Sequence, residues 1–369
     1  MNRPIIAITI GDVAGIGPEV VARALQDRAI YHVCRPFVIG DHNVLQQASR
    51  ELLRTVALDF DKISDSPLSR AGLAQQCAEF AHRQAIVCYN PAGDATALSE
   101  RRMVSCAAGE AAFQYLDKAI DLAQAGTVDG IATAPLNKAA LHAAGHQYPG
   151  HTEILAERCC VADFAMMLHL SESGIAGLRE LVGGGCEQSL HGLSIAHVTL
   201  HTSIASVPSL LTTHSIAEKV RLMHRFLADI GCDRKAIAVC ALNPHAGEEG
   251  LFGDEERDVI EPAVRRFDNH DINVSGPLPV DTLIRRAVAG EFDGVVAMYH
   301  DQGHIPIKLI GFDAAVNITL GLPIVRTSPT HGTAFDRAWD PKTPADPSGM
   351  IESILTAARL CRRKQHVKR

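Results

Sequence analysis

The stretch Pro4-Ile-Ile-Ala-Ile-Thr-Ile10, followed by Gly11-Asp12, gives the first indication of the fold. It is a short, mostly β-branched run that ends in a turn, as buried strands do. The residues from Pro18 to Ala29 then have the apolar spacing of a helix, with a proline in its first turn. Strand, glycine turn and helix in this order form the repeating unit of proteins in which helices pack on a largely parallel sheet.

The same order recurs along the chain. Further strand-like runs cover 37–39, 130–132, 195–200, 237–242 and 294–298, and a helix-like pattern covers 106–125. The sequence therefore predicts an α/β fold in which helices cover a largely parallel sheet.

Composition limits the class of protein. A chain of 369 residues is long enough for two domains, and 47% hydrophobic with 21% charged residues is ordinary for globular proteins. This balance excludes disordered and fibrous chains. The formal net charge of −7 provides no overall positive field for nucleic acid or anionic lipid, so we expect neither as a partner.

The cysteines and the N-terminus indicate the compartment. The ten cysteines are scattered without zinc-finger spacing, and the adjacent pair Cys159-Cys160 is poorly suited to a disulfide. The apolar run from Ile5 to Ile10 is too short for a signal peptide core or a membrane span. We therefore expect a reduced, cytoplasmic protein with no membrane segment.

The glycine-rich segment Gly11-Asp-Val-Ala-Gly-Ile-Gly17 does not have the spacing of a dinucleotide or phosphate-binding loop. We expect a tight strand-to-helix turn there, because glycine adopts positive φ without strain. An anion site at the N-terminus of the following helix is the alternative.

Three histidines, His201, His245 and His300, each closely follow a strand-like run. Ligand sites in parallel sheets form beyond the carboxyl ends of the strands, so these side chains are candidates to meet in one cleft. Three neutral imidazoles suit a borderline divalent ion such as Zn²⁺; hydrogen-bonded structural histidines are the alternative. Asp301 and Asp281 could orient the ligand rings, or could be turn and helix-cap residues.

Three lone cations lie next to apolar residues and are candidates for phosphate or carboxylate recognition. They are Lys138, Lys308 and Arg326. The alternative for each is an edge residue whose charged end reaches water.

Taken together, several segments resemble the 4-hydroxythreonine-4-phosphate dehydrogenase family, including its 4-phospho-D-threonate and 4-phospho-D-erythronate dehydrogenase relatives. They occur in family order over nearly the whole chain: Gly11–Glu19, Ala134-Pro-Leu-Asn-Lys138, Pro149-Gly-His-Thr-Glu153, Asn243-Pro-His-Ala-Gly-Glu248, Gly276-Pro-Leu-Pro-Val-Asp281, Tyr299-His-Asp-Gln-Gly303, Val316–Pro323, Arg326-Thr-Ser328 and His331-Gly-Thr-Ala334.

The resemblance implies a role for each matching residue. The metal ligands would be His201, His245 and His300, and the substrate contacts would be His151, Thr152, Lys308, Asn317 and Arg326. The segment His331, Gly332, Thr333 and Ala334 would lie near the adenosine of NAD or NADP. Lys138 is a candidate for proton transfer or substrate positioning, with Asp281 and Asp301 as further catalytic candidates.

The resemblance also implies a two-domain α/β/α architecture like that of isocitrate and isopropylmalate dehydrogenases. The active-site cleft would lie between the domains and be completed across a homodimer. We expect residues 1–135 plus 305–369 to form an outer domain with the cofactor loops, and residues 136–304 to form a central domain with the metal ligands and the dimer contacts.

The implied reaction is NAD(P)-dependent oxidation of the 3-hydroxyl of a phosphorylated four-carbon hydroxy acid, followed by decarboxylation of the β-keto acid. The substrate would be 4-phosphooxy-L-threonine or 4-phospho-D-threonate or -erythronate, and the divalent metal would be Zn²⁺, Co²⁺ or Mg²⁺. The alternative substrate is an aromatic cis-dihydrodiol carboxylate such as the terephthalate diol.

Three segments depart from the family pattern. Val13 replaces the usual proline, Phe335-Asp-Arg-Ala-Trp339 lacks an Ala-Gly pair, and residues from about Leu170 to Gly192 look like an insertion. We expect Val13 to be neutral and the other two to be surface loops, the alternative being that they reshape the rim of the cleft.

Overall fold

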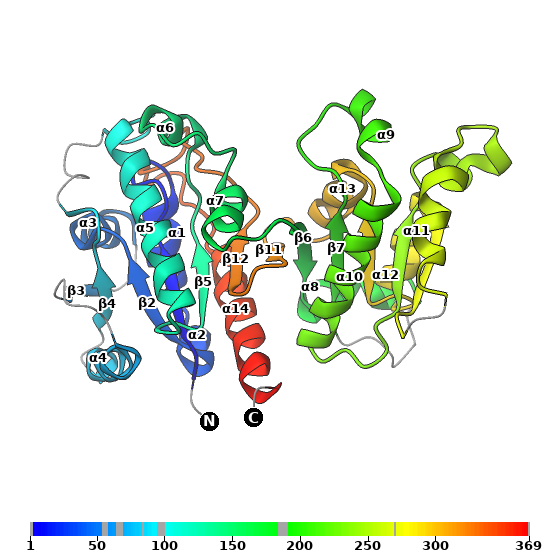
Figure 1. Ribbon diagram of the computed structural model, residues 1–369. Helices are drawn as coiled ribbons and strands as arrows, with labels where there is room; N and C mark the ends of the chain where they lie inside the picture. The colour runs from blue at the N-terminus through cyan, green and yellow to red at the C-terminus, as the bar shows by residue number, and fades with distance from the viewer. Residues whose placement is uncertain are drawn as a thin grey trace. The chain divides into compact units, whose positions relative to one another are not determined.

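The computed structural model describes residues 3–53, 58–63, 69–82, 85–93, 100–183, 191–268 and 271–367 (Figure 1). The chain forms two compact units. Unit 1 comprises residues 1–162 and 322–369, and unit 2 comprises residues 163–321.

These boundaries lie later in the chain than the sequence predicts. The segment 138–158 stays with unit 1 because its helices α6 (Lys138–Ala143) and α7 (His151–Arg158) pack on helix α5 (Cys106–Gln124). The segment 300–320 stays with unit 2 because helix α13 (His300–Gly311) and strand β11 (Val316–Leu320) both contact strand β6 (Ala165–Leu170). The expected division at 135/136 and 304/305 cuts through this packing.

The described residues of unit 1 include six parallel strands. In spatial order they are β3 (Asp59–Lys62), β4 (Ala85–Tyr89), β2 (Arg35–Ile39), β1 (Ile5–Thr9), β5 (Gly130–Thr133) and β12 (Val325–Pro329). All five residues of β1 are buried, which explains why its sequence is a continuous apolar run and does not alternate.

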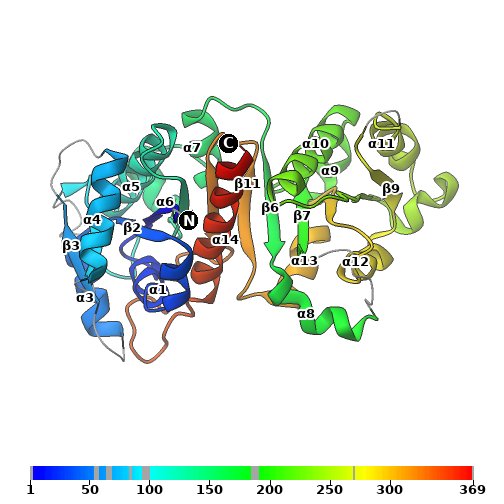
Figure 2. The same cartoon turned by 90° about the horizontal axis from the view of Figure 1, so that it is seen from below.

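Helices lie on both faces of this sheet (Figure 2). They are α1 (Gly17–Ala24), α2 (Arg28–Val33), α3 (His42–Leu52), α4 (Arg70–His82), α5, α6, α7 and α14 (Ser348–Val367). Helix α5 packs on β1 and β5, and α14 packs on β5 and β12. The predicted helix from Pro18 to Ala29 is in fact two helices, because Asp27 starts α2 by accepting a hydrogen bond from the Ala29 N–H.

In unit 2, the part of the chain that the structure describes forms six strands of mixed direction. Their spatial order is β11, β6, β7 (Leu193–His197), β10 (Gly294–Ala297), β8 (Ile237–Cys240) and β9 (Val274–Leu278). Strand β6 runs antiparallel to both β11 and β7, whereas β7, β10, β8 and β9 are parallel. Within each unit, the described strand pairings are parallel except for the two that β6 makes, in agreement with the prediction of a largely parallel sheet.

The helices of unit 2 also form two layers. They are α8 (Glu172–Leu181), α9 (Val207–Leu210), α10 (Thr213–Asp229), α11 (Glu261–Arg265), α12 (Val280–Val288) and α13, with short turns η2 (Ile204–Ser206), η3 (Pro244–Gly250) and η4 (Glu256–Ile260). Figure 2 shows α10 and α11 on one face of the sheet and α8, α12 and α13 on the other.

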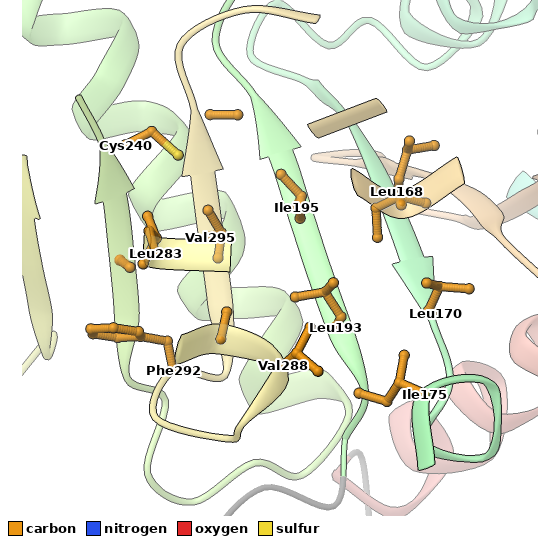
Figure 3. Close-up of a cluster of buried hydrophobic side chains, with 14 of the residues drawn as sticks. Leu168, Leu170, Ile175, Leu193, Ile195, Cys240, Leu283, Val288, Phe292 and Val295 are labelled. Carbon is orange, nitrogen blue, oxygen red and sulfur yellow. The ribbon is translucent and has the colours of Figure 1, made fainter. Parts of the chain in front are cut away.

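The apparent insertion contributes to the core of unit 2. Within residues 170–192, segment 172–181 is helix α8, and residues 184–190 lie outside the described residues. Figure 3 shows Ile175 of α8 among Leu168, Leu170 and Leu193, all buried. The expectation of a surface loop is therefore wrong for α8, since this helix covers part of the sheet.

Two further expectations concern cysteines and membranes. The described residues contain nine of the ten cysteines, and all nine are free thiols. Among the described helices, none combines the length and the apolar character that a membrane crossing requires.

Two glycines inside helices test the packing. A Cβ at Gly109 of α5 would lie 2.0 Å from the Ala140 carbonyl oxygen of α6, whereas a Cβ at Gly177 of α8 would meet nothing within 4 Å. We expect Gly109→Ala to lower the free energy of unfolding by about 1–3 kcal/mol, because the two helices must separate. Gly177→Ala, the matched control, should raise it by up to about 1 kcal/mol. Urea denaturation measures both, and equal effects would contradict the assigned α5–α6 contact.

Candidate functional site

The order of strands in unit 2 explains why three histidines distant in sequence leave the same edge of the sheet. Strands β7, β10 and β8 are neighbours and run parallel, so the loops that follow them begin at one edge. These loops carry His201, His300 and His245 respectively. The strand ends therefore place the candidate metal ligands on one side of unit 2.

His201 and His300 line a common recess. Their ring centroids are 6.0 Å apart, and the recess has a volume of about 510 Å³. His300 Nδ1 lies 2.7 Å from an oxygen of Asp301. Because a carboxylate only accepts hydrogen bonds, Nδ1 carries the proton and Nε2 keeps its lone pair, the arrangement of a metal-binding imidazole held by a carboxylate. His201 and His300 could therefore supply two imidazole ligands to a divalent metal, with Asp301 orienting the ring of His300.

Two buried histidines that the sequence analysis did not identify support His300. The His304 ring stacks on the His300 ring with centroids 3.6 Å apart, and His304 Nδ1 lies 3.2 Å from His197 Nε2. Burial lowers the pKa of His197 to about 4 and that of His304 to about 3, so both imidazoles are neutral near pH 7. The only sequence signal is that His304 follows the Tyr299–Gly303 motif directly.

His245 lies in an unusual turn. Residues 245–249 all have positive φ, from 44° to 82°, so η3 is a left-handed turn. Left-handed backbone costs roughly 1–2 kcal/mol for each residue that has a Cβ, so the surrounding structure must stabilise it. The His245 side chain is exposed.

The three histidines do not form a complete cluster within one chain. Among the residues that the structure describes, no group of three His, Cys, Asp or Glu side chains lies close enough to hold a metal ion. Asp281 is exposed in the first turn of α12, and its carboxylate accepts a hydrogen bond from the Thr282 N–H. This contact favours the alternative that Asp281 is a turn or helix-cap residue over the prediction that it orients a metal ligand.

Two predicted substrate contacts belong to unit 2. Lys308 is half-buried on α13, with its Nζ 5.8 Å from the centroid of the Phe312 ring. The side-chain oxygen of Asn317 on β11 is buried and accepts no hydrogen bond from the described residues. A buried amide oxygen without a donor suits a ligand that supplies one.

The other substrate candidates lie in unit 1, around Arg326. This arginine is only 2% exposed on β12, and its Nη2 donates a hydrogen bond of 2.7 Å to Thr133 Oγ1 on the neighbouring strand β5. Burial lowers the pKa of Arg326, and the negative charge of Glu153 opposes this effect. Sequence reasoning did not assign roles to Thr133 and Glu153, although Glu153 ends one of the matching motifs.

His151 and Thr152 begin helix α7, and the positive charge of Arg326 acts on His151. Burial, together with the positive charge of Arg326, holds the pKa of His151 well below its usual value. His151 is therefore a neutral hydrogen-bonding group beside a fixed cation. Lys138, by contrast, is exposed at the start of α6.

The glycine segment is a tight turn whose backbone is already hydrogen-bonded. The N–H groups of Asp12, Gly15 and Ile16 donate to the carbonyls of Pro135, Asp12 and Thr333, and the Ala14 N–H donates to the Asp12 carboxylate. These groups are not available to an anion, which favours the turn interpretation over an anion site.

The candidate cofactor segment packs on this turn. Thr333 accepts the hydrogen bond from Ile16, and Gly332 is exposed. Two of the departures from the family pattern contact each other here, because the Trp339 indole N–H donates a 3.0 Å hydrogen bond to the Val13 carbonyl. The segment after Ala334 is therefore a cover for the glycine turn and not a free surface loop.

Comparison with known proteins gives consistent results over the whole chain. A family model described as the pyridoxal phosphate biosynthetic protein PdxA matches residues 32–357. The D-threonate 4-phosphate dehydrogenase of Cupriavidus necator is 40% identical over 363 residues, covering 98% of each chain.

Two solved structures are also similar. A 4-hydroxythreonine-4-phosphate dehydrogenase from Klebsiella pneumoniae is 38% identical with a TM-score of 0.78, covering 97% of this chain and all of that one. A terephthalate 1,2-cis-dihydrodiol dehydrogenase from Burkholderia xenovorans is 28% identical with a TM-score of 0.60, covering 96% of this chain and 98% of that one.

Asp12 gives a pH-dependent prediction. Its side chain is fully buried, and burial raises its pKa to about 6, although the hydrogen bond from Ala14 acts in the opposite direction. Because the folded-state pKa exceeds the unfolded value near 4, the contribution of Asp12 to stability is present below pH 4 and is lost as the pH rises to 6. The free energy of unfolding of Asp12→Asn should therefore rise by up to roughly 3 kcal/mol relative to that of wild type as the pH increases from 4 to 7.

Urea denaturation at several pH values measures this difference. A difference between wild type and Asp12→Asn that stays constant from pH 4 to pH 8 would contradict the raised pKa.

Proposed function

The chain belongs to the PdxA family of pyridoxal phosphate biosynthetic proteins, and from this membership we propose that it is a metal- and NAD(P)-dependent dehydrogenase. Its substrate is a phosphorylated four-carbon hydroxy acid, either 4-phospho-D-threonate or -erythronate or 4-phosphooxy-L-threonine. The proposal includes the isocitrate dehydrogenase-like architecture that the sequence motifs imply, and a cytoplasmic location, with which nine free thiols are compatible.

The observation that carries this proposal is the buried arginine of unit 1. A guanidinium at 2% exposure needs an anionic partner or strong hydrogen bonds to offset the loss of water. Thr133 fixes one end of Arg326, and the neutral His151 adds no competing charge. Glu153 already contributes a negative charge near this guanidinium, and a guanidinium binds a phosphate or a carboxylate through two parallel hydrogen bonds, so the arginine is suited to a substrate that carries both groups.

We assign the divalent metal to His201, His245 and His300, with Asp301 orienting His300. The metal, Zn²⁺, Co²⁺ or Mg²⁺, would lower the pKa of the substrate hydroxyl and stabilise the negative charge that develops on its oxygen. His300 contributes a lone pair at Nε2 because Asp301 holds the proton at Nδ1.

We further propose a homodimer in which the partner completes the metal site. No three candidate ligands converge among the described residues of one chain, and helix α13, which begins at the ligand His300, has an exposed apolar face. Ile305, Leu309 and Phe312 on that face are 60%, 85% and 52% exposed. Their spacing places them in one stripe of the helix, as in surfaces that a partner covers.

The proposed reaction consists of an oxidation followed by a decarboxylation. The hydroxyl carbon loses a hydride to NAD(P)⁺ and its oxygen loses a proton, which gives a β-keto acid. Loss of CO₂ leaves an enolate that takes up one proton. Lys138, Asp281 or Asp301 would move these protons, and His331, Gly332, Thr333 and Ala334 would hold the cofactor, whose nicotinamide accepts the hydride.

An aromatic cis-dihydrodiol carboxylate is the second candidate substrate. A dehydrogenase of that class has the same fold, but at 28% identity and a TM-score of 0.60 it is less similar to this chain than the phosphate-specific relatives. The test is reduction of NAD⁺ and NADP⁺, followed by absorbance, with D-threonate 4-phosphate, 4-hydroxythreonine 4-phosphate and the terephthalate diol. Turnover of the diol alone would overturn the proposal that the substrate is phosphorylated.

Arg326→Ala should lower kcat/KM about 10- to 150-fold, because a charge-assisted contact to a desolvated anion contributes roughly 1.5–3 kcal/mol. Arg326→Lys should recover only part of the loss, since an ammonium cannot form two parallel hydrogen bonds to one anion. Steady-state kinetics measures both variants.

Comparing a phosphorylated substrate with its unphosphorylated analogue shows which anion each cation binds. Replacing a residue that binds the phosphate must lower kcat/KM more for the phosphorylated substrate than for its unphosphorylated analogue. If Arg326→Ala and Lys308→Ala penalise both substrates equally, neither residue binds the phosphate, and both serve a carboxylate that the substrates share.

Removal of the metal should abolish dehydrogenase activity, and Zn²⁺ or Co²⁺ should restore it. If the partner supplies a ligand, dilution that separates the subunits should lower metal affinity and activity together. Analytical ultracentrifugation with parallel activity assays measures this. Full activity from a proven monomer would contradict the shared site.

A further inference from the structure

The left-handed turn η3 requires stabilisation from outside itself. Four of its residues with positive φ carry a Cβ, including His245. Such backbone persists only where neighbouring groups hold it in place. Residues 241–244 connect strand β8 to His245 at the start of this left-handed run, so the position of this histidine depends on what fixes the chain just before it.

Glu256 supplies that fixation. Its Oε1 accepts hydrogen bonds from the Leu242 N–H at 2.8 Å and the Asn243 N–H at 2.7 Å, and its Oε2 accepts one from Asn243 Nδ2 at 2.9 Å. One carboxylate therefore holds both residues that lead from β8 into the turn.

The turn also packs directly on this carboxylate. A Cβ at Gly247 would lie 2.8 Å from Glu256 Oε2, so only glycine leaves room for it at that position. Glu256 lies in η4, a single π-helical turn, and π turns are frequent at functional sites.

Glu256 does not bind a ligand itself. Its side chain is buried, with 3% of the residue exposed, and both oxygens accept hydrogen bonds from the chain. The neighbouring Glu255 has a different role. Among the described residues, its Oε2 accepts a hydrogen bond from Asn243 Nδ2, and it accepts none from the backbone N–H groups of Leu242 and Asn243.

We propose that Glu256 is a positioning residue that holds His245 ready for the divalent metal by fixing the backbone of Leu242 and Asn243. This inference rests on the proposed metal role of His245. Loss of a group that orients a metal ligand typically lowers metal affinity 10- to 100-fold, which sets the expected effect at about that size.

The test compares Glu256→Gln, Glu256→Ala and the matched control Glu255→Gln. Metal-free full-length protein is titrated with Co²⁺ alone, and binding is followed by the visible absorbance of the bound ion and by competition with a chelating dye. Glu256→Gln keeps an oxygen for the two backbone N–H groups but loses the acceptor for Asn243 Nδ2, so it should weaken Co²⁺ binding about 10-fold; Glu256→Ala should weaken it by up to about 100-fold.

Glu255→Gln should bind Co²⁺ as wild type does. Hydrogen exchange of residues 242–250 should accelerate in the Glu256 variants and not in Glu255→Gln. At saturating Co²⁺, kcat of Glu256→Gln should approach the wild-type value, because the role of Glu256 is to position a ligand and not to react.

Equal Co²⁺ affinity in all four proteins would overturn the inference, and so would equal losses in Glu255→Gln and Glu256→Gln, which would indicate a general effect of charge. If Glu256→Ala fails to fold, Glu256→Gln decides the outcome. Failure of the proposed function is distinguishable, since wild type itself would then bind no Co²⁺.

Discussion

The candidate site residues of each unit depend on one constraint, the parallel alignment of neighbouring strands. Parallel strands end at the same edge of a sheet, so the segments that follow them emerge together whatever their separation in sequence. In unit 2, β7, β10 and β8 deliver His201, His300 and His245 to one edge. In unit 1, β1, β5 and β12 bring together the glycine turn, the segment before Lys138 and the segment His331–Ala334.

Burial then decides the charge of the groups at these edges. In unit 1, Arg326 is buried next to Thr133, and the half-buried His151 is neutral. In unit 2, His197 and His304 are buried and neutral. In unit 1, the Arg326 cation therefore lies beside the neutral His151, a combination suited to a substrate with anionic oxygens. Asp12 shows the opposite arrangement, a buried carboxyl that favours its protonated form.

Positioning groups are as prominent as the candidate ligands. Asp301 fixes the tautomer of His300, the His304 ring stacks on that of His300, and Glu256 holds the backbone before His245. Such groups determine orientation, and orientation decides whether three imidazoles can share one ion. The exposed apolar stripe on α13 belongs to the same region, because that helix begins at His300.

The sequence by itself determined the α/β class, the strands β1, β5 and β10, the family and the candidate residues, because these depend on local apolar patterns and on motifs that are continuous in the chain. It did not determine the antiparallel strand β6, the burial of α8 or the unit boundaries. Strand direction and helix packing follow from contacts between segments distant in sequence, which no local pattern records.

The same reason applies to the site. Residue types indicated imidazole ligands and an anion-binding arginine, whereas Thr133, His197 and Glu256 acquire their roles only through partners far away in the chain: Thr133 bonds Arg326, His197 bonds His304, and Glu256 bonds the backbone before His245. The exposure of Lys138 and the closure of the glycine turn by Thr333 and Trp339 were likewise decided by tertiary structure. The sequence indicates which functional groups are present, whereas their burial and orientation follow from tertiary packing.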